Sequence, residues 1–215
     1  MKKLLLPLLI TSSFSASAAP YIGLEYGIGH TNHNVEAHFL QDNLVLKPDL
    51  DEGIFSGIVG YSFNDTWAIE LGYSQYEPDD GRSQYLGVEK VNGQDYLTEH
   101  EWDASIKAKQ LSLAPVYHYT LNDKWTAKFK AGLTYTEYKA QANKHKDYEL
   151  VTNNDVEFSE SLYHQSDKSK RVGAMLAAGA EYKVLPKLAI GSNVKYQFDS
   201  YADTLSLNIY TNYYF

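Results

Sequence analysis

Three acidic residues, Glu99, Glu101 and Asp103, are spaced by two along the chain and are potential ligands for a cation. On a strand, residues spaced by two point to the same face. Carboxylate oxygens are ligands that Ca²⁺ prefers, so the spacing makes a weak candidate cation site. A solvated acidic loop edge is the commoner use of such a run, and both readings stay open at this point.

Nucleophilic catalysis would need a serine beside a histidine that an acidic group orients. Histidines and serines are common in the polar connections, but no local signature singles out one pair. Gly27-Ile28-Gly29 is not a nucleotide loop, because no lysine stands in the required position. We therefore expect no enzyme activity, no catalytic residue and no cofactor. The histidines of those connections are His30, His33, His38, His100, His145 and His164.

The elements that must position these residues are strands, because apolar residues recur with a period of two. The last segment shows the pattern most clearly: Leu205, Leu207, Ile209, Tyr213 and Phe215 share one face. Pro115 falls inside a predicted strand, where it cannot donate a ladder hydrogen bond, so we expect a bulge there. The predicted strands are 21–29, 54–63, 67–76, 110–119, 125–135, 171–182, 188–198 and 205–215.

The connections between these strands alternate in length. Asn64-Asp65-Thr66 and Asn122-Asp123-Lys124 are short, and Asn-Asp pairs favour tight hairpins. The connections over 30–53, 77–109 and 139–170 are long and polar. Short turns at one end and long loops at the other are typical of a barrel that crosses an outer membrane.

The two faces of the strands differ in charge and bulk. One face carries large apolar and aromatic side chains without charge in the strand cores, and the other is rich in glycine. A narrow lumen needs small residues, so we expect the polar face to point inward and the apolar face to meet lipid. A soluble periplasmic lipocalin-like barrel, with the opposite orientation, is the alternative. The expected lumen charges are Glu25, Glu70, Lys128, Lys130, Arg171, Glu181 and Lys195.

The N-terminus and the composition limit where the chain works. Lys2 and Lys3 precede the apolar run 4–10, and Ala16-Ser17-Ala18 is a cleavage site, so we expect residues 1–18 to be a removed signal peptide. The remainder, 19–215, is then a single barrel domain. The formal net charge is −8, which argues against a nucleic-acid partner. The chain has no cysteine, which excludes a disulfide-stapled scaffold.

These features together resemble the small outer-membrane barrels of the OmpA transmembrane-domain and OmpX type. The residues that carry the resemblance are the signal peptide, the echoed Asn-Asp turns and the terminal aromatic strand. Within this group, Tyr21-Ile22-Gly23-Leu24-Glu25-Tyr26-Gly27 and the length make the chain similar to the accessory colonisation factor A family of vibrios. The resemblance implies an eight-stranded antiparallel up-and-down β-barrel that crosses the outer membrane of a Gram-negative bacterium. It also implies that Leu205, Leu207, Ile209, Tyr213 and Phe215 are read by the barrel-assembly machinery.

The function that we expect is presentation of three long extracellular loops for colonisation or adhesion, with both termini in the periplasm. The expected partners are outer-membrane lipids and lipopolysaccharide, and a host-surface receptor. Tyr85, Tyr96 and Trp102 are interleaved with the acidic residues and are the candidate contact residues. A lipopolysaccharide-modifying outer-membrane enzyme is the alternative function.

Overall fold

The computed structural model describes residues 19–215, and the expected signal peptide lies outside them. Within this part of the chain, no helix is long and apolar enough to cross a membrane. The strands are β1 Ala19–His33, β2 Ala37–Phe39, β3 Leu44–Leu46, β4 Ile54–Ser62, β5 Trp67–Tyr76, β6 Asp79–Val91, β7 Gln94–Thr120, β8 Trp125–Leu150, β9 Glu157–Leu185, β10 Leu188–Phe198 and β11 Ala202–Tyr214.

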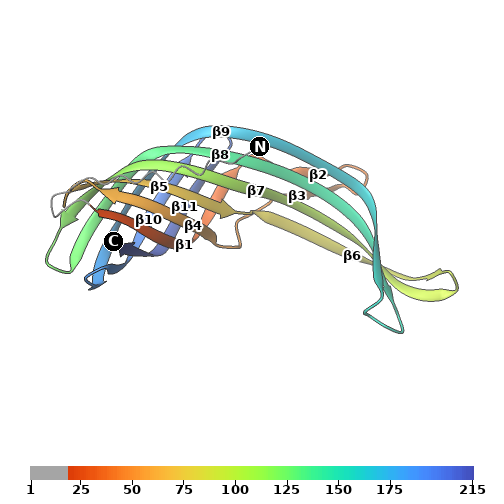
Figure 1. Cartoon of the computed structure of the whole chain (residues 1–215). Helices are drawn as coiled ribbons and strands as arrows, with labels where there is room; N and C mark the ends of the chain where they lie inside the picture. The colour runs from red at the N-terminus through yellow and green to blue at the C-terminus, as the bar shows by residue number, and fades with distance from the viewer. Residues whose placement is uncertain (1–18) are drawn as a thin grey trace, which may run out of the picture.

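Eight of these strands close into a barrel. Within the ring, each of β1, β4, β5, β7, β8, β9, β10 and β11 pairs antiparallel with two of the others, and the pairing of β5 with β7 completes the ring (Figure 1). Closure satisfies the backbone groups of both edges, which hydrocarbon could not hydrate. The predicted eight-stranded antiparallel barrel is confirmed.

The two echoed turns have the same local chemistry. The Asn64 side-chain oxygen accepts hydrogen bonds from the backbone N–H groups of Thr66 and Trp67, at 2.9 and 2.8 Å. Asn122 accepts in the same way from Lys124 and Trp125, both at 3.0 Å. A short polar side chain that folds back on its own backbone fixes a tight hairpin, as the sequence predicts.

The orientation of the two faces also agrees with the prediction. Charged side chains such as Glu25 and Lys128 are buried in the lumen, whereas Leu24 and Ile209 are more than half exposed on the outer wall. The inward glycines make room for rings: a Cβ on Gly60 would strike the ring of Tyr21, and a Cβ on Gly191 that of Tyr210. This arrangement is opposite to the oily interior of a lipocalin-like barrel, so that alternative is wrong.

The expected bulge at Pro115 is absent. Leu113 lies opposite Leu133, and Val116 lies opposite Lys130, so the register of β7 against β8 is the same on both sides of the proline. Pro115 itself lies opposite Ile69 of β5. The strand accommodates the missing N–H by leaving a gap in the ladder, and the inward and outward faces keep their order.

The predicted long loops are largely wrong, because three barrel strands continue far past the ring. Residues 94–105 of β7 pair with β6, and residues 139–150 of β8 pair with both β7 and β9. β6 and the outer parts of β7, β8 and β9 form a curved sheet that leaves one end of the barrel (Figure 1). We call this sheet, made of 79–91, 94–105, 139–150 and 157–170, the extension.

The connection over 30–53 contains the hairpin β2–β3, which packs on the inner face of the extension. Phe39 and Leu46 of the hairpin share a buried apolar cluster with Trp102 and Ala104 of β7. Nearer the barrel, a second buried cluster closes the mouth of the lumen. Its members are Leu50, Ile54, Tyr76, Ile106, Ala108, Tyr138 and Ala202.

Candidate functional sites

The lumen contains a network of buried charges centred on Glu70 of β5. Lys130 of β8 forms an ion pair with one oxygen of this carboxylate, and Lys128 Nζ lies 3.6 Å from the other. The hydroxyl of Tyr21 donates to Glu70 at 2.8 Å. All four side chains are buried, so each charge depends on its partners rather than on water.

Two further carboxylates extend the network around the ring. Glu25 of β1 accepts from Lys195 at 2.6 Å and from Asn193 at 2.7 Å, both on β10. Glu181 of β9 accepts from Lys128 at 3.2 Å and from the side chains of Asn212 and Tyr214 at 2.7 Å. The network therefore joins β1, β5, β8, β9, β10 and β11 across the lumen.

The network fills the lumen. The space between Glu25, Glu70, Lys130 and Lys195 has a volume of about 20 Å³, roughly that of a single water molecule. The apolar cluster at the mouth closes the same passage a second time. We conclude that the described barrel is a packed structure and that its interior acts as a structural core.

One predicted member of the network is misplaced. Arg171 lies in β9 opposite Thr136, close to the mouth, and its Nη1 donates to the carbonyl oxygen of Lys170 at 2.9 Å. It therefore binds backbone at the rim instead of pairing with a lumen carboxylate. The other six predicted residues form the ion pairs described above.

The residues predicted as an assembly signal lie together on the outer wall. Leu205, Leu207, Ile209, Tyr213 and Phe215 are all exposed, and Tyr213 and Phe215 pack edge to face at 5.3 Å. Outward apolar side chains are what a lipid-facing strand requires. Recognition by the assembly machinery stays a prediction.

The extension buries two of the three candidate contact residues. Trp102 and Tyr96 point to the inner face, where they are 3 % and 8 % exposed, whereas Tyr85 is 61 % exposed. The interpretation of Trp102 and Tyr96 as surface anchors is wrong, because β7 continues as a strand and its even-numbered residues face inward. Trp102 instead donates to Asp42 at 3.0 Å, and Lys144 binds the other oxygen of that carboxylate at 2.7 Å.

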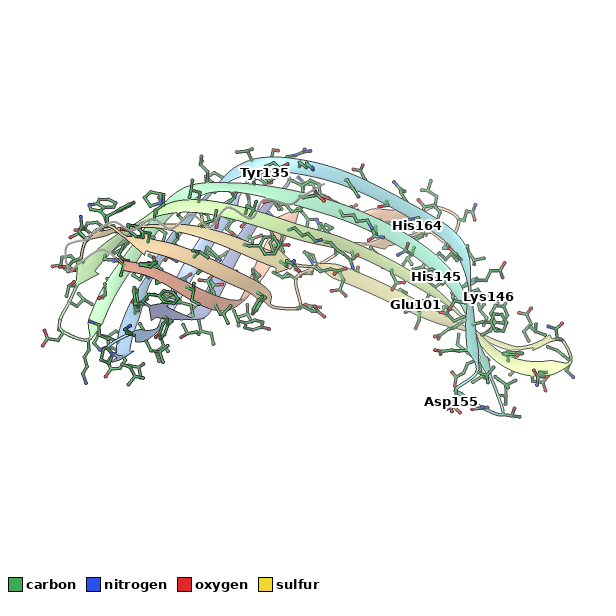
Figure 2. All side chains as sticks on the ribbon, viewed as in Figure 1. Glu101, Tyr135, His145, Lys146, Asp155 and His164 are labelled. Atoms are coloured by element: carbon green, nitrogen blue, oxygen red, sulfur yellow. The ribbon has the colours of Figure 1, made fainter. Side chains whose placement is uncertain are left out.

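The outer face of the extension carries the alternating carboxylates Glu99, Glu101 and Asp103, as predicted for a strand. Burial, Asp103 and a hydrogen bond with Asp147 raise the pKa of Glu101 above its ordinary value. Burial likewise raises the pKa of Asp103. Figure 2 shows Glu101, His145 and Lys146 far out on the extension, with Tyr135 on the barrel. Within residues 19–215, no group of three or more histidine, cysteine, aspartate or glutamate side chains is arranged to hold a metal ion.

Three of the six histidines considered for catalysis have other partners. His33 Nε2 lies 2.8 Å from the carbonyl oxygen of Pro48, and His164 Nδ1 lies 2.6 Å from the side-chain oxygen of Asn143. His30 lies 3.1 Å from Asp49 on the exposed rim. None of these contacts is the serine contact that a hydrolytic site requires.

The closed ring, the lipid-facing apolar wall and the charged lumen define a transmembrane β-barrel. The chain belongs to the family described as "Outer membrane protein beta-barrel domain", which it matches over residues 4–214. It is therefore an outer-membrane protein of the small-barrel class.

Among known proteins, the chain is similar to two opacity proteins of Neisseria gonorrhoeae. It is 24 % identical to opacity protein opA55 and 27 % identical to opacity protein opA56, each over 156 residues. Each match covers 65 % of this chain and 66 % of the relative, slightly less than two thirds of its length.

Solved structures share the fold. Ail, the attachment invasion locus protein of Yersinia pestis, solved with the heparin analogue sucrose octasulfate, superposes with a TM-score of 0.50 at 14 % identity, over 93 % of this chain and 99 % of Ail. Neisserial surface protein A superposes with a TM-score of 0.50 at 10 % identity, over 92 % of this chain and 99 % of its own.

Proposed function

We propose that this protein is a non-catalytic adhesion factor that helps a Gram-negative bacterium to colonise a host. In this proposal the short turns face the periplasm and the extension stands outside the cell, where it contacts a host-surface receptor. The resemblance to the accessory colonisation factor A family that we expect from the sequence motivates this role, and the fold shared with a protein named for attachment and invasion supports it.

The observation that carries the proposal is the extension itself. Residues 79–105 and 139–170 continue the barrel strands as a sheet instead of connecting them by flexible loops. A membrane anchor alone has no need of this sheet, whereas a binding surface gains from rigid presentation because less conformational entropy is lost on contact.

The strand register defines a shortened chain that removes the extension and its hairpin. Ala37 lies opposite Leu46, Asp79 opposite Ser105, and Gln141 opposite Ser166. Replacing 38–45, 80–104 and 142–165 by Asn-Gly in each case should close three two-residue hairpins.

Attachment of bacteria to cultured host cells tests the role of the extension. We expect the full chain to confer attachment and the shortened chain to lose at least about tenfold, at equal amounts in the outer-membrane fraction. Equal attachment by the two chains would rule out adhesion through the extension.

Surface proteolysis on intact cells tests the orientation separately. Trypsin should cut at an exposed lysine of the extension, such as Lys90, and should leave Lys124 and Lys187 in the short turns uncut. Cleavage at the short turns with protection of the extension would reverse the proposed orientation.

A further inference from the structure

Three lysines stand side by side on the outer face of the chain, where the barrel wall passes into the extension. Lys107 of β7 lies opposite Lys139 of β8, and Lys139 lies opposite Lys168 of β9. We call these three residues the lysine row. Each shares its face with the wall residue four positions along its strand, because side chains separated by an even number of residues point the same way. Those wall residues, all exposed, are Leu111, Tyr135 and Val172.

A second row lies between the lysine row and the apolar wall. Lys109 lies opposite Glu137, which lies opposite Lys170. Glu137 pairs with Lys170 at 3.3 Å, and Glu77 pairs with Lys107 at 3.2 Å. Within residues 19–215, three of the five lysines of the two rows form no ion pair: Lys109, Lys139 and Lys168.

The two rows carry a net positive charge. The carboxylates nearest to them on the same face are Glu77, Glu137 and Asp79, which lies opposite Ser105 in the next row outward. The five lysines exceed these three carboxylates by two. Since Glu77 and Asp79 stand at the edge beside β5 and β6, the excess lies over β8 and β9.

The lysine row is electrostatically unfavourable by itself. Directly opposite residues of neighbouring strands have their Cβ atoms about 4.5–5.5 Å apart, and like charges in that position destabilise a sheet. Lys139 has a like charge on both sides. An anion that binds between Lys139 and Lys168 replaces this repulsion by two attractive contacts.

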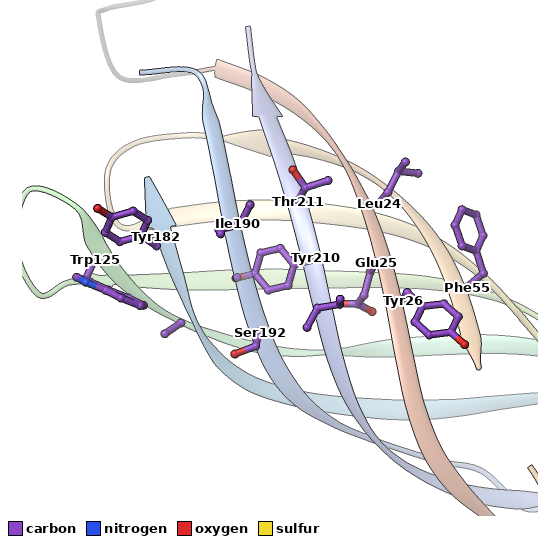
Figure 3. A pocket seen from close by; sticks show the side chains of 13 residues that line it. Leu24, Glu25, Tyr26, Phe55, Trp125, Tyr182, Ile190, Ser192, Tyr210 and Thr211 are labelled. Atoms are coloured by element: carbon purple, nitrogen blue, oxygen red, sulfur yellow. The ribbon is translucent and has the colours of Figure 1, made fainter. Parts of the chain in front are cut away.

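The other side of the barrel offers no comparable charge. Of the described residues that line the hollow shown in Figure 3, Glu25 alone is charged, and it is buried in the lumen. At the rim beside β1 and β4, the exposed carboxylates Asp49, Asp51 and Glu52 outnumber Lys47. The positive charge is therefore confined to the part of the rim that β7, β8 and β9 form.

The height of the rows matches the headgroup of a lipid. At about 3.4 Å per residue and a strand tilt of about 45°, the second row lies about 5 Å and the lysine row about 10 Å beyond the apolar row of Tyr135. The headgroup region of a bilayer is about 5–7 Å thick on each side. A lipid phosphate at the surface of the membrane is thus within reach of both rows.

The distal part of the extension disfavours a long anionic polymer as the occupant. Glu99, Glu101 and Asp103 lie farther out on the same face of β7, and Asp147 lies opposite Glu99. A sulfated glycan that approached from solution would meet these carboxylates first. A lipid reaches the rows by diffusing within the membrane, so it avoids this repulsion.

We infer that the lysine row binds the phosphates of lipid A, the membrane part of lipopolysaccharide. One phosphate lies between Lys139 and Lys168, Lys109 contacts the same headgroup, and the acyl chains lie on the wall below Tyr135. Clustered lysines next to a membrane are a usual site for anionic headgroups. The inference rests on the proposed orientation, because an extension outside the cell places the rows in the leaflet that contains lipid A.

Native mass spectrometry of the full barrel tests the site. The protein is refolded into phosphatidylcholine nanodiscs that contain equal amounts of lipid A and dephosphorylated lipid A, released into detergent, and its retained lipids are counted. We expect the wild type to prefer lipid A about tenfold or more. Both leaflets have the same composition here, so a reversed orientation in the cell would fail the trypsin experiment and not this one.

Three variants test the residues, and each is first checked for folding by its heat-modifiable gel mobility. Lys139→Gln with Lys168→Gln should lose the preference for lipid A. Glu137→Gln should raise it about twofold or more, because this change removes a carboxylate and releases Lys170. Lys124→Gln with Lys187→Gln, in the short turns at the opposite end, removes the same charge and should behave as the wild type.

Several results would overturn the inference. Equal retention of the two lipids by the wild type would do so, as would an unchanged preference in Lys139→Gln with Lys168→Gln. Displacement of lipid A from the wild type by a heparin fragment would assign the row to a sulfated glycan instead. The attachment experiment remains independent, because the shortened chain keeps all five lysines.

Discussion

At the scale of single residues, Glu70 is the carboxylate on which the lumen depends most. It is approached by Lys128, Lys130 and the hydroxyl of Tyr21, all of them buried. Removing one member of a buried ion pair leaves the other charge without compensation, which costs about 3–5 kcal/mol. We expect Glu70→Gln to lower the free energy of unfolding by about 3 kcal/mol, measured by urea unfolding in lipid vesicles.

Two controls test this explanation. Adding Lys130→Met to Glu70→Gln should recover part of the loss, because it removes the charge left unpaired. Glu137→Gln breaks an exposed pair with Lys170, at 3.3 Å, and should change stability by less than about 1 kcal/mol. A loss for Glu70→Gln no larger than that of Glu137→Gln would contradict the role of the network.

In the extension, Asp42 has a role comparable to that of Glu70 in the lumen. Its contacts with Trp102 and Lys144 hold the β2–β3 hairpin on the extension. A hydrogen bond from Lys144 and another from Trp102 hold the pKa of Asp42 below its usual range. A carboxyl whose pKa is lowered by folding contributes stability above its unfolded pKa and loses it as the pH falls through the folded pKa.

We therefore expect Asp42→Asn to loosen the hairpin by about 1 kcal/mol at pH 7 and to have little effect near pH 2. The indole of Trp102 reports the change, since water that reaches it shifts its fluorescence to the red. Trp67→Phe with Trp125→Phe gives a background in which Trp102 is the remaining tryptophan. If Asp42→Asn and the background protein have the same fluorescence spectrum at pH 7, Asp42 does not hold the hairpin on the extension.

At the scale of elements, the sequence predicts strands best where one face meets lipid. The limits of β5 and β10 agree with the predicted 67–76 and 188–198, because the outward residues are mostly apolar and the inward residues are mostly small or polar there. The Asn-Asp turns could also be predicted, since the asparagine supplies its own hydrogen bonds.

The extension was missed because both of its faces contain polar residues. In 102–110, Trp102, Ala104, Ile106 and Ala108 alternate with charged or polar residues, which is a strand signal that the surrounding charges obscured. The inner face of the distal part also contains His100 and Lys144, so apolar content falls away from the membrane. Arg171 was predicted to join the lumen network because alternation places it on the inward face. Its position along the barrel axis, near the mouth, depends on the strand register, which the sequence alone does not give.

The distal carboxylates make a prediction for the extension as an element. The pKa of Glu101 is raised by burial and by its acidic neighbours, so protonation is favoured by folding. A raised carboxyl pKa makes the folded strand less stable as the pH rises through it. We expect Glu101→Gln to slow amide hydrogen exchange in 97–103 and 143–149 at pH 7, relative to wild type, and to give no difference once the pH is well below the ordinary glutamate pKa.

Lys146→Gln is the opposite control, because it removes an ion pair with Glu89, at 2.5 Å, from the same sheet. It should speed exchange or leave it unchanged. If Glu101→Gln also speeds exchange, repulsion among the carboxylates does not limit the stability of the extension.

At the scale of the whole molecule, the barrel and the extension have separate cores. The lumen network and the cluster at its mouth hold the ring, whereas Phe39, Leu46, Trp102 and Ala104 hold the hairpin on the extension. We expect the shortened chain, without 38–45, 80–104 and 142–165, to fold with heat-modifiable mobility and to keep more than half of the wild-type free energy of unfolding. Failure of the shortened chain to fold would show that the ring requires the extension.

The hydrogen bonds to Glu181 have a consequence for the order in which the barrel is built. Two of its donors, Asn212 and Tyr214, belong to β11, the strand that pairs with β1 to close the ring. Until that strand docks, the carboxylate faces Lys128 without them, and an unfinished ring would expose a charge to hydrocarbon. An open ring is thereby penalised in the membrane, so the lumen favours insertion of a barrel that β11 has already closed against β1.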